Sequence, residues 1–93
     1  MLRSVKIFVS GRVQGVFFRS YARTFVGGLR NVTGYVKNLR DGRVEIYAEG
    51  PEASLRALVE WAKQEGSPAS QVLRTEENWE DAPTRQYNEF EIM

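Results

Sequence analysis

The sequence contains no cysteine and no histidine among its 93 residues. Without cysteine there can be no disulfide framework, so the fold must rest on its hydrophobic core. Neither a thiolate nor an imidazole can serve as a nucleophile or general base, and the usual zinc sites, which need these ligands, are excluded. Any catalysis must therefore use arginine, lysine, carboxylates, asparagine, tyrosine, serine or backbone groups.

Long apolar runs are also missing. No stretch approaches the roughly 20 apolar residues that a membrane-spanning helix needs, and residues 1–6 lack the apolar core and cleavage site of a signal peptide. We therefore expect a cytoplasmic protein that does not bind membranes. The length, with 42% hydrophobic and 12% aromatic residues, predicts one folded domain over residues 1–93.

The net charge is only +1, which gives no indication of a nucleic-acid or membrane partner. The charges are nevertheless distributed unevenly. Residues 1–43 carry nine lysines and arginines and a single acid, Asp41, whereas residues 44–93 carry four and eleven respectively. An anion site in the first half would explain this distribution. It is also compatible with two halves that interleave in the fold and mix their charges on the surface.

Hydrophobic periodicity predicts the order of the elements. Val5, Ile7 and Val9 alternate with other residues as in a strand, and the apolar residues from Phe18 to Leu29 recur at helical spacing. The first helix is expected to end near Asn31, with Gly27-Gly28 as an alternative end. Seven elements are expected, namely strands near 5–10, 34–39, 43–49, 72–79 and 90–92 and helices near 18–31 and 51–65.

This order predicts an α+β fold of the ferredoxin-like class. Its βαββαβ pattern forms an antiparallel sheet that two helices cover on one face, and a short C-terminal strand follows. The Asp41-Gly42 pair indicates a tight turn between the second and third strands. Trp61, on the second helix, is expected to contribute to packing. Because this fold hosts many unrelated functions, it decides nothing about activity by itself.

The segment after the first strand has the features of an anion site. Gly11 and Gly15 allow positive φ and a close approach to a ligand. The segment leads into a helix N-terminus, where N–H groups are unpaired and the macrodipole is positive. Arg19 falls in that first turn, where the macrodipole disfavours a cation, and a bound anion would resolve the conflict. An ordinary strand–loop–helix corner with a solvated arginine is the alternative.

Two stretches resemble the signatures of a known family. Gly11-Arg12-Val13-Gln14-Gly15-Val16-Phe17-Phe18-Arg19 resembles the first signature of the acylphosphatases, and the residues from Gly34 to Glu45 resemble the second. Smaller matches follow at Ser67-Pro68-Ala69 and Phe90-Glu91-Ile92. The resemblance spans nearly the whole chain, and two signatures in the expected order are more specific than either alone.

The resemblance implies hydrolysis of the carboxyl–phosphate anhydride bond of acyl phosphates, without a metal or an organic cofactor. Arg19 and Asn38 match the family's catalytic residues, the arginine that binds phosphate and the asparagine that orients the attacking water. The phosphate-binding residues it implies are Gln14, Gly15, Val16, Phe17, Phe18 and Arg19. From its own pattern, Asn38 is better explained as an ordinary residue before a turn.

The expected partners and two alternative functions complete the prediction. We expect an acyl phosphate as substrate, inorganic phosphate as product and competitive inhibitor, no nucleic acid, and a monomer. One alternative is a catalytically inactive acylphosphatase-like domain with a regulatory or interaction role. Another is an RNA-binding module with the same βαββαβ order, but the strand at 43–49 has one aromatic residue, Tyr47, and two glutamates that would repel phosphates.

Overall fold

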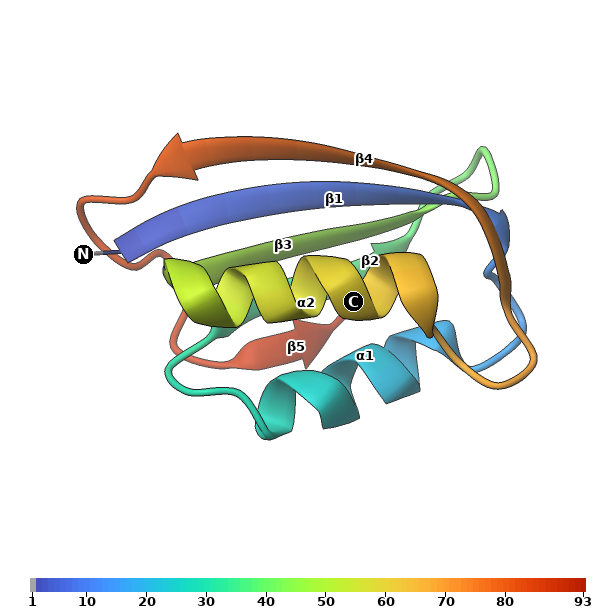
Figure 1. Ribbon diagram of the computed structural model, residues 1–93, viewed down its shortest axis with the longest axis horizontal. Helices are drawn as coiled ribbons and strands as arrows, with labels where there is room; N and C mark the ends of the chain where they lie inside the picture. Colours follow the sequence, from blue (N-terminus) through green and yellow to red (C-terminus); the bar gives the residue numbers. More distant parts are fainter. Residues whose placement is uncertain (1) are drawn as a thin grey trace.

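The structure, a computed structural model, describes residues 2–93 (Figure 1). The α+β class and the ferredoxin-like order of elements are confirmed. The elements are β1 (Leu2–Arg12), α1 (Phe18–Gly27), β2 (Thr33–Asn38), β3 (Val44–Pro51), α2 (Glu52–Gln64), β4 (Gln71–Asp81) and β5 (Phe90–Ile92).

The five strands form one sheet in the order β4-β1-β3-β2-β5, and Figure 1 shows both helices on the same face of it. The four longer strands pair antiparallel, as expected. β5 instead lies parallel to β2, with Gly34 opposite Phe90 and Val36 opposite Ile92, so the sheet as a whole is mixed. This arrangement places the end of the chain beside β2, on the far side from β3.

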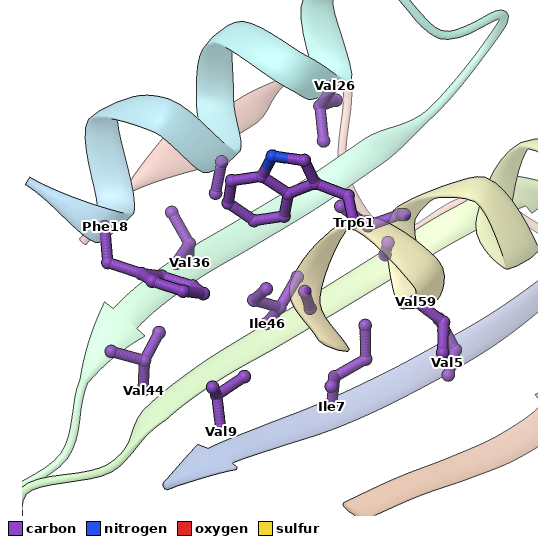
Figure 2. Close-up of a cluster of buried hydrophobic side chains, with 14 of the residues drawn as sticks. Val5, Ile7, Val9, Phe18, Val26, Val36, Val44, Ile46, Val59 and Trp61 are labelled. Carbon is purple, nitrogen blue, oxygen red and sulfur yellow. The ribbon is translucent and has the colours of Figure 1, made fainter. Parts of the chain in front are cut away.

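The core lies between the sheet and the two helices (Figure 2). Val5, Ile7 and Val9 are fully buried because alternate residues of a strand point to the same face. Trp61 fills the space between the helices, with its ring 5.2 Å from that of Phe18, centroid to centroid. Its side chain is buried, so the expected packing role of Trp61 is confirmed.

The first helix is shorter than the expected 18–31. It ends at Gly27, with Gly28 as its C-cap, and the Gly28 N–H donates to the Phe25 carbonyl at 3.0 Å. Asn31 does adopt the left-handed conformation expected of it, at φ 58°, but it lies beyond the helix in the connection to β2. The glycine pair thus ends the helix before the asparagine is reached, because glycine disfavours a helix interior.

The face of the sheet opposite the helices carries buried polar groups. Glu49 is fully buried, and its carboxylate accepts hydrogen bonds from the Tyr47 hydroxyl at 2.9 Å and from the backbone N–H groups of Gln86 and Tyr87 at 2.7 and 2.8 Å. These bonds tie the connection between β4 and β5 to the sheet. Within residues 2–93, no helix is long and apolar enough to cross a membrane.

Candidate active site

A five-residue loop, Val13 to Phe17, connects β1 to α1. Figure 1 shows it at the same end of the sheet as the turn between β2 and β3. Gly15 has φ +74°, and a Cβ placed there would meet no atom within 4 Å. The positive φ, not crowding, therefore explains the glycine. Phe17 also has positive φ, 61°, although it is an aromatic L-residue, and it is the N-cap of α1.

The side chain of Gln14 joins this loop to the β2–β3 turn. Its Nε2 donates to the carbonyl of Leu39 at 2.7 Å and to that of Arg43 at 2.9 Å. Each carbonyl also accepts a backbone N–H inside the turn, so the bonds from Gln14 use second lone pairs. The spacing between the loop and the end of β2, where Asn38 lies, is thus set by a direct side-chain bridge.

A second bridge comes from Ser67, in the turn after α2. Its hydroxyl donates to the Val16 carbonyl at 2.7 Å, and the residue is only 1% exposed. In the sequence, Ser67 is recognisable only as part of a minor family match, and this hydrogen bond could not be predicted from that match. Gly66, next to it, has φ +61°, and a Cβ placed there would lie 2.6 Å from the Ser70 hydroxyl oxygen and 3.0 Å from the Phe18 ring. The Gly-Ser-Pro sequence that follows the helix is the local pattern that could have predicted an ordered turn here.

The loop, the start of α1 and the end of β2 enclose a pocket of about 230 Å³. It brings together Arg19 from α1 and Asn38 from β2, which are 19 positions apart in the sequence. The residues that line it are Val13, Gly15, Phe17, Phe18, Arg19, Ser20, Asn38 and Ile92. The lining does not include Gln14, whose side chain bonds the turn, or Val16, which is buried with its carbonyl bonded to Ser67.

The electrostatics of this pocket favour an anion. Among the described residues that line it, Arg19 carries the only formal charge. Its Nη1 donates to the Met93 backbone oxygen at 2.9 Å, which orients the guanidinium and leaves further donors of the fork for a ligand. The N-terminus of α1 has no side-chain cap and no acidic residue in its first turn. Its first N–H groups therefore remain open to an anion.

A larger hollow of about 560 Å³ lies on the opposite face of the sheet, around Lys6 and Tyr47. Its walls include Glu80 and Asp81, whose carboxylates disfavour a phosphate there. The smaller pocket at the β1–α1 loop is thus the better anion site. No group of three or more acidic side chains within residues 2–93 gathers closely enough to hold a metal ion.

Known proteins are similar to this chain in fold and in sequence. The family model described as Acylphosphatase matches residues 5–92. Acylphosphatase-1 of Gallus gallus is 41% identical over 92 residues, which cover 98% of this chain and 92% of that protein. The crystal structure of acylphosphatase from Bacillus subtilis matches with a TM-score of 0.89 and 42% identity, covering 100% of this chain and 99% of that one. An acylphosphatase from Coxiella burnetii matches with a TM-score of 0.84, 39% identity, and coverage of 99% and 93%. The chain therefore belongs to the acylphosphatase family.

Proposed function

We propose that this protein hydrolyses acyl phosphates to a carboxylate and inorganic phosphate. One observation supports this more than any other: a single pocket is lined by the cationic Arg19, the open N-terminus of α1 and Asn38. The first two suit a phosphoryl group, and the third suits a water molecule. Acylphosphatase relatives of similar length support the same substrate class.

The phosphoryl group binds between the Arg19 guanidinium and the backbone N–H groups of the loop and first helical turn. Gly15, Phe17 and Phe18 contribute these N–H groups from the lining of the pocket, with Val16 and Gln14 in the same run of backbone. Their charge and dipoles stabilise the equatorial oxygens as negative charge redistributes in the transition state. Because the donors are fixed before substrate binds, little reorganisation is needed during the reaction.

Asn38 holds a water molecule in line with the bond between phosphorus and the bridging oxygen. A bond forms between the water oxygen and phosphorus, and the carboxylate leaves with the electron pair of the broken bond. The water's proton passes to an oxygen of the substrate's own phosphoryl group. A carboxylate is a weak base and a good leaving group, so no protein acid is needed to protonate it. In agreement with this mechanism, none of the described residues that line the pocket is acidic.

Further properties belong to the same proposal. The reaction needs no metal, because Arg19 and the backbone N–H groups supply the positive charge. Inorganic phosphate, the product, competes with the substrate for the same site. The protein acts as a cytoplasmic monomer without a nucleic-acid partner.

The test is hydrolysis of benzoyl phosphate in the presence of EDTA by the wild-type protein and by Arg19→Ala and Asn38→Ala variants. We expect activity in the wild type. Loss of the arginine should lower kcat by about 1000-fold, as when a transition-state donor is removed. Loss of the asparagine should lower kcat by about 100-fold, as when a reactant is misplaced.

Arg23→Ala is the matched control, because Arg23 is an exposed arginine of the same helix and does not line the pocket. This variant should keep wild-type kcat. Unaltered activity in folded Arg19→Ala and Asn38→Ala would contradict the assignment of these two residues. A wild-type rate equal to that of buffer would contradict the hydrolase function itself.

A further inference from the structure

Phe17 combines two unfavourable local features. Its backbone lies in the left-handed region at φ 61° and ψ 22°, which costs an L-residue about 1–2 kcal/mol. Its side chain is 76% exposed, although burial of a phenylalanine is worth about 1.5–3 kcal/mol. Neither feature helps the chain to fold. Residues that break local rules in this way are commonly found at functional sites.

The position of Phe17 indicates what its ring can contact. It lines the same pocket as Arg19 and Asn38, and Ile92 of β5, itself 38% exposed, lines that pocket too. Within residues 2–93, one other large apolar residue is comparably exposed, Leu73 at 74%, and it belongs to β4 and does not line this pocket. Exposed apolar surface is therefore present at the site where the substrate binds.

The acyl group of a bound substrate can extend from the pocket only on its solvent-facing side. Val13 and Phe18 are 1% and 2% exposed, so that side of the pocket is closed by packed side chains. Arg19 and the loop N–H groups hold the phosphoryl group, and Asn38 holds the water. The remaining part of the substrate must extend toward solvent, where the large apolar side chains among the exposed lining residues are those of Phe17 and Ile92.

We propose that Phe17 and Ile92 form an apolar surface that binds the acyl group and selects substrates with large apolar or aromatic acyl groups over acetyl phosphate. This inference rests on the proposed hydrolysis of acyl phosphates. An aromatic acyl group can pack against the Phe17 ring, with about 0.5–1.5 kcal/mol beyond the area that it buries. A methyl group offers too little surface to gain much from the same contact.

The experiment compares kcat/KM for benzoyl phosphate and for acetyl phosphate in the wild type, Phe17→Ala, Phe17→Leu and Ile92→Ala. The ratio of the two values should fall about tenfold in Phe17→Ala, within the range that apolar contacts discriminate. Most of this change should appear in KM for benzoyl phosphate. Phe17→Leu should restore part of the ratio, because leucine keeps an apolar side chain, and Ile92→Ala should lower the ratio by a smaller factor.

Leu73→Ala is the control, since it removes an equally exposed apolar side chain outside the pocket. Its ratio should equal that of the wild type. If the wild type hydrolyses both substrates and the ratio in folded Phe17→Ala stays within twofold of the wild type, the acyl-binding surface is refuted and the hydrolase function stands. If the wild type hydrolyses neither substrate, both proposals fail.

Discussion

At the scale of single residues, Phe17 holds a left-handed backbone two positions after Gly15, which is free to adopt one. The sequence allows positive φ at Gly11 and Gly15, and both have it, Gly11 near the end of β1 and Gly15 in the loop. Nothing in the local sequence predicts a left-handed Phe17, because an L-residue disfavours this region. Hydrogen bonds to the rest of the fold fix the residues before it, from Gln14 to the β2–β3 turn and from Ser67 to the Val16 carbonyl.

The backbone strain at Phe17 can be measured by comparing Phe17→Gly with Phe17→Ala. Both variants lose the ring, but only alanine keeps a Cβ in the left-handed region. We expect Phe17→Gly to have the larger free energy of unfolding, by about 1 kcal/mol. Urea denaturation of the two variants provides the measurement. Equal stabilities, or a more stable alanine variant, would show that Phe17 is not strained.

Tyr35 and Tyr47, on the face of the sheet opposite the helices, link the free energy of unfolding to pH. Burial raises the pKa of both hydroxyls, and the carboxylates that accept their hydrogen bonds, Glu45 and Glu49, raise it further. A folded-state pKa above the unfolded value means that the folded state favours the protonated tyrosines. Their contribution is complete below about pH 10, the ordinary tyrosine pKa, and is lost as the pH rises above it.

We therefore predict that the free energy of unfolding in urea falls between pH 8 and pH 11. Tyr35→Phe should be less stable at pH 8, by about 1–3 kcal/mol, because the buried Glu45 loses a donor. The same variant should lose less stability than the wild type between the two pH values. Tyr21→Phe, which changes an exposed tyrosine of α1, is the control. An identical pH dependence in wild type and Tyr35→Phe would contradict the linkage.

At the scale of elements, the loop and the β2–β3 turn act as one unit. The first signature marks Gln14 as a phosphate-binding residue, and that assignment remains a proposal for its backbone. Its side chain has another role here, because both of its hydrogen bonds go to the turn. The sequence could not predict this bridge, since Leu39 lies 25 positions away and its backbone carbonyl carries no sequence signal.

Gln14→Leu removes the bridge and keeps a side chain of similar size. We expect kcat for benzoyl phosphate to fall about tenfold, because the loop and Asn38 lose their fixed spacing. KM should change less, since the loop N–H groups and Arg19 remain. Gln64→Leu, at the exposed end of α2, should behave as wild type. A fall in stability with no change in kcat would show that the bridge serves folding alone.

The ends of elements were the least predictable part of the fold. The strand periodicity near Val72 to Trp79 predicts only part of β4, which extends from Gln71 to Asp81. The additional residues pair along β1, from Arg3 opposite Asp81 to Arg12 opposite Gln71. Such pairing depends on the partner strand, so a local pattern cannot determine where it stops.

At the scale of the whole molecule, the order of elements was sufficient to predict the layers. Period-two and helical patterns determine which faces are apolar, and these faces then meet in the core shown in Figure 2. The direction of β5 was not predictable in this way, because a three-residue strand has too short a pattern to determine its pairing. Its parallel pairing with β2 brings Ile92 into the lining of the pocket.

The fold also explains why two distant signatures form one site. β1 and β3 pair antiparallel, so the end of β1 and the start of β3 lie together. β2 also ends there, at the same end of the sheet. The loop after β1 and the residue at the end of β2 therefore meet. Their convergence on one pocket supports the proposed reaction, in which Arg19 binds the phosphoryl group and Asn38 orients the water molecule that attacks it.

The most direct test of this central claim is hydrolysis of benzoyl phosphate in water enriched in ¹⁸O, with the label located by mass spectrometry of both products. Attack of water at phosphorus predicts one ¹⁸O atom in inorganic phosphate and none in benzoate. The spontaneous reaction, run without protein, is subtracted. Label in benzoate would mean that water attacks the carbonyl carbon, and the roles assigned to Arg19 and Asn38 would then be wrong.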